Sequence, residues 1–403
     1  MINSTSKQYE ANWRRNLAVC VFGSFTTVFA MTLILPFLPI YVEQLGVEGH
    51  SAIVQWSGIA YSATFITAGI FAPIWGMLGD RYGRKSMLVR ASFGMTIAIL
   101  LMGLASNIWQ FLGLRLLAGV AGGYSSGATI LIAMQAPKNK SAWSLGLLSS
   151  GVMAGNLLGP LVGGALPALI GVRETFWSAS FLIFIAFLAT LLLLLQEAPR
   201  EHQDSAQRGT KTKLVNIPNK KVVIIMLMTG LLLMVANMSI EPIITVYVGT
   251  LITDISQVSF ISGLVMSAAA LGSIISASKL GKIADQIGHA KIIIIAFAAS
   301  SLLLIPQAFV TTGWQLIILR FFMGLAFGGL LPCVATVIRH SVPEHLVGGI
   351  MGWSISAQFA GQVIGPLIGG FVGGQFGMQA VFLGTSLLML LGALANWWVI
   401  RNK

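Results

Sequence analysis

The stretch Gly76-Met-Leu-Gly-Asp-Arg-Tyr-Gly-Arg-Lys85 returns in altered form as Gly281-Lys-Ile-Ala-Asp-Gln-Ile-Gly-His-Ala290. Both copies hold Gly, Asp and Gly at the same places, at a shift of 205 residues: Gly76, Asp80 and Gly83 match Gly281, Asp285 and Gly288. A long fixed period is typical of a duplicated architecture. One half of the 403-residue chain is therefore expected to repeat the other.

Three further segments support the duplication, at shifts of 205 or 206 residues. They are Trp109-Gln110, Arg115 and Gly119 against Trp314-Gln315, Arg320 and Gly324; Pro36, Tyr41 and Val42 against Pro242, Tyr247 and Val248; and Gly155 with Gly159-Pro160 against Gly361 with Gly365-Pro366. Agreement across separate segments with a drift of one residue predicts two repeats of similar structure.

The composition excludes a soluble or disordered chain. Apolar residues make up 56% of the sequence and charged residues only 9%, whereas a soluble domain has about 25% charged residues. So few charges cannot cover the surface of a soluble globule, and disordered chains are poor in apolar residues. The sequence therefore predicts an all-α polytopic membrane protein.

Twelve apolar runs have the length that a bilayer requires, about 20 residues each. They are expected near 17–42, 54–77, 86–105, 108–135, 142–168, 175–196, 222–248, 258–279, 291–310, 314–338, 347–372 and 379–400. The first run is too long for a signal-peptide core and is expected to be retained. Each half holds six runs, an even number, so the two halves are expected to enter the membrane in the same orientation, as parallel repeats.

The charges indicate the orientation of the chain. The net charge is +12, and nearly all Lys and Arg residues fall in the two tails and in the loops on one side of the expected membrane. By the positive-inside rule that side is cytoplasmic, so both termini are expected there. The basic excess is thus a topology signal, and no nucleic-acid partner is expected. The expected domains are 1–196, a polar cytoplasmic linker at 197–221, and 222–403.

Three charged residues fall inside the expected spans: Arg115, Arg320 and Glu241. Charges at such depth are costly and are functional candidates by default. One interpretation is a permanent ion pair between Glu241 and Arg320. The other is that Glu241 exchanges a proton while Arg115 or Arg320 tunes it. The excess of one positive charge favours anionic or zwitterionic substrates.

The repeated loop around Asp80 is a candidate cytoplasmic gate. Its carboxylate either ties two helices together and latches the gate, or the loop only orients the chain. The candidate gate residues are Gly76, Asp80, Arg81, Gly83, Arg84 and Lys85, with Asp285 and Gly288 in the second copy. Because Gln286 and His289 replace Arg81 and Arg84, the second copy is expected to be the weaker latch.

Small residues at a spacing of four lie on one helix face, where they let two backbones approach closely. Those of helices 5 and 11 serve either as helix packing or as a sliding seam between halves: Gly155, Gly159, Pro160, Gly361, Gly365 and Pro366. Polar and aromatic residues on the expected cavity helices are either packing or substrate contacts: Tyr61, Tyr124, Asn156, Asn237, Trp353, Gln358 and Gln362.

These motifs resemble those of the major facilitator superfamily. The run 76–85 is similar to its loop signature between helices 2 and 3. The run Arg115-Leu-Leu-Ala-Gly119, the helix 5 glycines with Pro160, and Leu35-Pro36-Phe-Leu-Pro39 resemble motifs of its twelve-helix drug:proton antiporter-1 family. The resemblance implies multidrug efflux by proton antiport with alternating access, from a monomer in a bacterial inner membrane.

Two departures from that family concern the coupling. Leu35 stands where the second repeat has Glu241, and helix 4 carries no acidic residue. A carboxylate in the N-terminal half, which many relatives carry, is therefore missing. Glu241 is the one intramembrane carboxylate left to titrate.

Other functions fit the sequence less well. Export of one endogenous metabolite, such as a siderophore, would use the same fold, and proton symport is a further alternative. A membrane-embedded enzyme would need clustered His, Cys or carboxylates at membrane depth, but the five histidines fall in loops. No phosphate-binding GxxxxGK[ST] motif occurs. We therefore expect a transporter of small molecules without enzyme activity, metal or cofactor.

Overall fold

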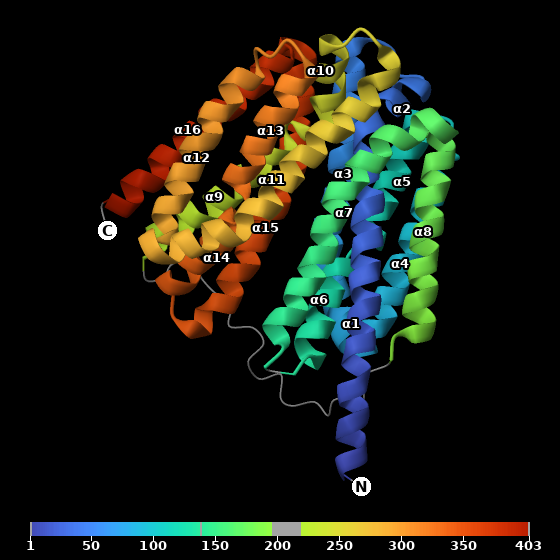
Figure 1. The fold of residues 1–403 in the computed structure, drawn as a ribbon, viewed down its shortest axis with the longest axis vertical. Helices are drawn as coiled ribbons and strands as arrows, with labels where there is room; N and C mark the ends of the chain where they lie inside the picture. The colour runs from blue at the N-terminus through green and yellow to red at the C-terminus, as the bar shows by residue number, and fades with distance from the viewer. Residues whose placement is uncertain (1, 138, 196–218, 402–403) are drawn as a thin grey trace. The chain divides into compact units, whose positions relative to one another are not determined.

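The computed structural model describes residues 2–137, 139–195 and 219–401. Most of the expected linker 197–221 lies outside these residues. In the first sequence half the helices are α1 (Ile2–Leu33), η1 (Leu35–Phe37), α2 (Leu38–Gln44), α3 (His50–Tyr82), α4 (Arg84–Met102), α5 (Ile108–Ala121), α6 (Tyr124–Gln135), α7 (Ser141–Ile170) and α8 (Val172–Leu193), as Figure 1 shows.

The second sequence half repeats this order of elements. Its helices are α9 (Lys220–Met238), η4 (Glu241–Ile243), α10 (Ile244–Leu251), η5 (Ile255–Gln257), α11 (Val258–Ile287), α12 (His289–Gln307), α13 (Gly313–Phe327), α14 (Leu330–Ser341), α15 (Glu344–Phe376) and α16 (Met378–Arg401). Within the described ranges these helices form twelve segments long and apolar enough to cross a membrane. The expected all-α fold with twelve spans is confirmed.

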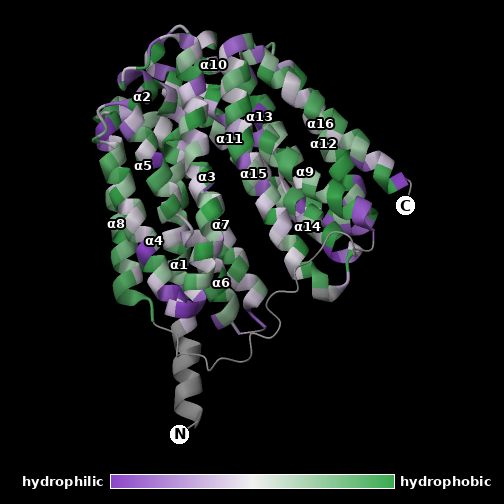
Figure 2. Cartoon of the chain, turned by 180° about the vertical axis from the view of Figure 1, so that it is seen from behind, coloured by the Kyte–Doolittle hydropathy of each residue, from purple (hydrophilic) through white to green (hydrophobic). Residues whose placement is uncertain are grey.

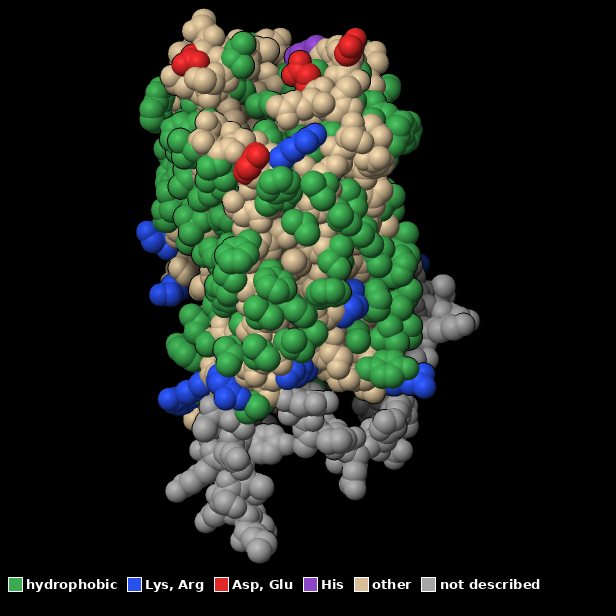
Figure 3. All heavy atoms as spheres, turned by 90° about the vertical axis from the view of Figure 1, so that its right-hand side faces the viewer, with side chains coloured by type: hydrophobic (Ala, Val, Ile, Leu, Met, Phe, Trp, Pro, Cys, Tyr) green, Lys and Arg blue, Asp and Glu red, His purple; other side chains and the backbone are tan. Residues whose placement is uncertain are grey.

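The outward-facing side chains suit a lipid environment. Large apolar residues stay exposed along the helices, for example Phe181 (65%), Leu302 (68%) and Leu387 (57%). Hydrophobic residues dominate the helix surfaces in Figure 2, and on the face in Figure 3 they form a broad band. Because a bilayer core offers no hydrogen bonds to the backbone, spanning segments must be helical, which explains why these segments are helices.

Four of the twelve spans are broken at equivalent places in the two repeats. The first and seventh spans break before Pro36 and Pro242, where short 3-10 turns follow α1 and α9. Proline lacks a backbone N–H and so interrupts the helical hydrogen bonds. The fourth and tenth spans break at glycine pairs, Gly122-Gly123 and Gly328-Gly329. The extra residue in the second repeat, Phe327, precedes the second pair and accounts for the drift from 205 to 206.

The chain forms two compact units whose boundary runs through α3. The first unit comprises Met1–Gly46 and Ala63–Arg200, and the second comprises Val47–Ser62 and Glu201–Lys403. The beginning of α3 therefore packs with the second unit, although it precedes that unit in sequence by more than a hundred residues. In the first unit α1 packs against α7 and α8. In the second unit α9 packs against α15 and α16.

Candidate functional site

Glu241 lies at the break between α9 and α10, inside the second unit. It is the first residue of η4, directly before Pro242. Its carboxylate accepts two hydrogen bonds: the Tyr61 hydroxyl donates to Oε2 at 2.9 Å and the Asn237 amide donates to Oε1 at 3.2 Å. The interrupted helix thus presents the carboxylate to neutral donors from α3 and α9.

Tyr61 reaches this carboxylate because the start of α3 is held firmly in the second unit. Its side chain is 4% exposed. The neighbouring Ser62 hydroxyl donates to the Val363 carbonyl of α15 at 2.6 Å. Gly58 lies against Pro366 O and Gly370 Cα of the same helix, leaving no room for a Cβ atom. Close backbone contact and two hydrogen bonds therefore fix Tyr61 beside Glu241.

Arg320 of α13 supplies the positive charge in this region. Its side chain is 3% exposed, and it interacts electrostatically with Glu241. Its Nε has no hydrogen-bond partner among the described residues. The recorded hydrogen bonds of the carboxylate come from Tyr61 and Asn237 rather than from this guanidinium. The described hydrogen bonds thus tie Glu241 to neutral donors, and a permanent ion pair with Arg320 stays a prediction.

Arg115 is the repeat mate of Arg320 and is fully buried on α5 in the first unit. Its backbone carbonyl accepts a hydrogen bond from Thr64 at 3.1 Å. One turn later, Gly119 lies so close to the Thr64 carbonyl that a Cβ would clash. Gly324 lies in the same way against the Ala269 carbonyl in the second unit. Each buried arginine thus lies on a helix that packs closely against a neighbour: Arg115 on α5 against α3, and Arg320 on α13 against α11.

The two loop copies form local ion pairs at equivalent places. Asp80 pairs with Arg84, and Asp285 lies 3.3 Å from the His289 imidazole, which is charged only when protonated. Gly83 (φ +89°) and Gly288 (φ +103°) adopt a backbone conformation that favours glycine. Each glycine turns the chain directly into the next helix. Among the other gate candidates, Arg81 lies over the Tyr82 ring and Gly76 has open space around it. Lys85 is the second residue of α4.

The glycines of helices 5 and 11 form close helix contacts within each unit. A Cβ on Gly155 or Gly159 of α7 would meet the α1 backbone at Phe25 and Phe29. On α15, Gly361 and Gly365 lie against Leu231 O and Val235 O of α9. These glycine faces are therefore occupied by helices of their own unit, as the packing interpretation expects. Pro160 and Pro366 are buried in the same helices. A sliding role remains a prediction.

The cavity candidates separate into distinct environments. Asn237 and Tyr61 bind Glu241, and two α15 residues face polar or soft partners nearby: Gln362 donates to Met234 Sδ at 3.7 Å and Gln358 to Ser354 Oγ at 3.4 Å. Trp353 is partly buried on the same helix, and Asn156 is exposed on α7 in the first unit.

Tyr124 is a correction to the expected cavity. Its side chain is 2% exposed in a hydrophobic cluster with Leu17, Cys20 and Leu131. Its hydroxyl bonds to Thr190 of α8 at 2.7 Å. The apolar cluster and this internal partner make Tyr124 a packing residue. These partners on α1 and α8 lie far from Tyr124 in the sequence, so its aromatic character alone could not indicate this packing.

Sequence reasoning named the residues of the site but missed the breaks in the spans. The two glycine pairs and the prolines were visible as paired signals, and their coincidence in both repeats could have predicted the breaks. The contact between Tyr61 and Glu241 spans 180 residues and left no local signal. Within the described residues, no group of three His, Cys, Asp or Glu side chains could hold a metal ion.

Comparison with known proteins agrees with this architecture. The family model of the Major Facilitator Superfamily matches residues 20–311 and 250–403. The chain is 44% identical to the multidrug resistance protein MdtG of Salmonella typhimurium over 97% of both chains. It is also 44% identical to MdtG of Citrobacter koseri, over 97% of this chain and 96% of that one.

Solved structures share the fold at low sequence identity. A D-xylose-proton symporter matches with a TM-score of 0.79 at 14% identity, covering 96% of this chain and 97% of that chain. The human organic anion transporter MFSD10 matches with a TM-score of 0.69 at 18% identity, covering 95% and 99%. The twelve spans, the duplicated motifs and these matches together show that the chain belongs to the Major Facilitator Superfamily, a family of multi-pass membrane transporters of small molecules.

Proposed function

We propose that this protein exports small amphipathic compounds in exchange for protons, and that Glu241 carries the proton. The single observation behind this proposal is the partly buried Glu241 carboxylate, held by Tyr61 and Asn237 with Arg320 nearby. Its relatives named multidrug resistance protein support a drug-like substrate class. A buried carboxylate with neutral donors can exist in both protonation states, which a proton carrier requires.

The physical link to transport is the divided helix α3. Its beginning belongs to the second unit, whereas the part from Ala63 onward belongs to the first. An ionised Glu241 accepts the Tyr61 hydrogen bond with a full charge, and such bonds are about twice as strong as neutral ones. Proton binding weakens this attachment of α3. A ligand or proton shifts a conformational equilibrium by its difference in affinity between states, so this bond can couple protonation to alternating access.

The direct test is transport by purified protein in liposomes with an imposed pH gradient. Anionic, neutral and zwitterionic amphiphiles are compared with cations, because the two buried arginines outnumber Glu241. The wild type is expected to exchange substrate downhill and to accumulate it against its own gradient only when the pH gradient is imposed. Glu241→Gln should lose gradient-driven transport while retaining downhill exchange of substrate.

Glu43→Gln is the matched control, since Glu43 is an exposed carboxylate on α2. It should transport like the wild type. Tyr61→Phe keeps the ring and removes only the hydroxyl, so it should weaken coupling without unfolding the protein. If Glu241→Gln still responds fully to the pH gradient, the proton role of Glu241 is wrong.

The proposal includes an orientation and a location. Both termini are proposed to be cytoplasmic and the protein to be a monomer in a bacterial inner membrane; the basic residues that gather at one set of loops support the orientation. Single cysteines in the loop after Tyr82 and in the loop after Leu45 should be labelled from opposite sides by an impermeant thiol reagent. Labelling of both from the same side would refute this topology.

A further inference from the structure

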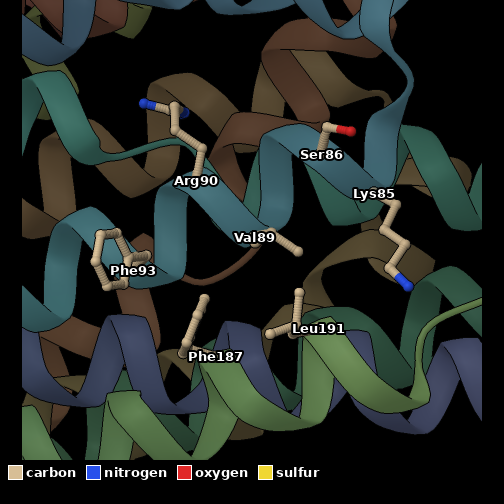
Figure 4. Close-up of a pocket in the computed structure, with 7 residues that line it drawn as sticks. All are labelled: Lys85, Ser86, Val89, Arg90, Phe93, Phe187 and Leu191. Atoms are coloured by element: carbon tan, nitrogen blue, oxygen red, sulfur yellow. The ribbon is translucent and has the colours of Figure 1, made fainter.

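In the first unit, α4 and α8 leave a groove of about 550 Å³ on the outside of the helices (Figure 4). This volume lies within the range of small-ligand sites, about 300–1,000 Å³. The groove is lined by α4 and α8 alone, and because both have the length and composition of membrane spans, we expect it to face lipid. The helices come from the same unit, so the groove does not depend on how the two units are placed.

The length of the groove is apolar and aromatic. Phe93 of α4 and Phe187 of α8 have ring centroids 5.2 Å apart. Phe93 is 48% exposed and Leu191 41% exposed, and Val89 lies between Phe93 and Lys85 along α4 (Figure 4). Apolar side chains that are this exposed on a membrane span make their van der Waals contacts with the hydrocarbon chains of lipids. The surface suits one acyl chain lying along the groove.

A single available cation marks one end of the groove. Lys85 lies at the start of α4, and its side chain extends toward the Leu191 end of α8 in Figure 4. The two neighbouring arginines are already engaged. Arg84 pairs with Asp80, and Arg90 stacks on Trp75 while donating to the carbonyls of Val120 and Gly122. Lys85 has no carboxylate partner among the described residues.

We propose that this groove binds an anionic phospholipid, with its phosphate at Lys85 and one acyl chain along Val89, Phe93, Phe187 and Leu191. The order of the groups matches the lipid, because the cation stands at the helix end and the apolar residues follow into the span. Net negative charge is the distinguishing feature: a zwitterionic headgroup carries its own ammonium, which reduces its attraction to Lys85. Each Lys near an anionic membrane surface contributes about 1 kcal/mol.

The second repeat provides a matched control. Lys291 stands one residue beyond the mate of Lys85, but the mates of Phe93 and Phe187 are Ala298 and Ala393. It therefore offers the same charge without the aromatic groove. Lys291→Gln removes a basic residue at an equivalent helix start and should leave the groove lipid in place.

Native mass spectrometry of the full-length protein, titrated with phosphatidylglycerol or phosphatidylcholine, tests the proposal. The wild type should hold one phosphatidylglycerol more tightly than phosphatidylcholine, and Lys85→Gln should weaken it about fivefold, the factor that 1 kcal/mol represents. Val89→Trp, which fills the groove, should remove the tight adduct altogether. The added lipid should also raise the melting temperature of the wild type more than that of Lys85→Gln.

Three results would overturn the proposal. Equal losses in Lys85→Gln and Lys291→Gln would indicate general surface charge. Equal binding of phosphatidylcholine would show that the groove does not select charge. Displacement of the adduct by inorganic phosphate alone would mean that the acyl contacts contribute nothing.

Discussion

The broken first and seventh spans are the most informative pair of regions in the molecule. Both contain proline at the break, at Pro36 and Pro242, and both then form a short helix. Tyr41 donates to the Met102 carbonyl at 2.5 Å, and its mate Tyr247 donates to the Gln307 carbonyl at 2.8 Å. At this break the two repeats therefore share the proline and a tyrosine hydrogen bond that anchors the short helix.

The same pair differs in the residue that carries charge. The mate of Glu241 is Leu35, which is 3% exposed. The two donors to Glu241 are replaced as well, since Met31 stands at the position of Asn237 and Met266 at that of Tyr61. The second unit thus holds a complete polar cluster around Glu241, with Asn237 from the second repeat and Tyr61 from the first, and not a lone carboxylate. Residues that are the same in both repeats thus maintain the fold, and residues that differ between the repeats indicate the function.

The strongest way to break this comparison is to move the carboxylate between repeats. Glu241→Leu makes the seventh span resemble the first and should reduce gradient-driven transport at least tenfold, as loss of a general acid or base does. Leu35→Glu in that background should not restore transport, because methionines at the mates of Asn237 and Tyr61 cannot donate hydrogen bonds. Liposome transport under a pH gradient measures both. Recovery in the double variant would show that the cluster is not required.

Glycine contacts should show equal effects in the two repeats. Gly163 lies against the Leu33 carbonyl and Gly369 against the Ser239 carbonyl, so an added Cβ would collide with backbone in each case. Gly163→Ala and Gly369→Ala should each destabilise their unit by about 1–3 kcal/mol, the usual cost of overpacking. Thermal unfolding in detergent measures the change. Gly113→Ala and Gly384→Ala are controls with open space around the new atom, and they should not lower the melting temperature.

The features that the sequence could predict are the ones that the two repeats share, and the features that it could not predict are individual contacts. The twelve spans and the repeat were predictable because hydrocarbon thickness and duplication leave long patterns. The packing of Tyr124 was not predictable, because its partners Leu17 and Thr190 lie far from it in the sequence. The attachment of Val47–Ser62 to the second unit could not be predicted, since α3 is one continuous helix and its apolar pattern does not reveal which neighbour each part contacts.

The tyrosine hydrogen bonds offer a finer test of symmetry. Tyr41→Phe and Tyr247→Phe each remove one hydrogen bond to a buried residue's carbonyl, and each should cost about 1 kcal/mol of stability. Transport under saturating gradient should be unchanged in both. Tyr61→Phe provides the contrast, because its hydroxyl serves Glu241 and its loss should affect coupling more than melting temperature. A Tyr247 effect several times that of Tyr41 would contradict the structural equivalence of the two repeats.

The loop pairs should show the smallest effect, and here the repeats are expected to differ. The Asp80 side chain is 34% exposed beside a mostly buried Arg84, whereas Asp285 is 72% exposed beside a histidine. Exposed ion pairs contribute about 0.2–1 kcal/mol and are screened by salt. Asp80→Asn should therefore lower the melting temperature more than Asp285→Asn, and 0.5 M salt should reduce the difference. His289→Arg gives the second loop a permanent cation and should increase the effect of Asp285→Asn in its background. If the two aspartates contribute equally before that change, the charge of the partner does not set the strength of the pair.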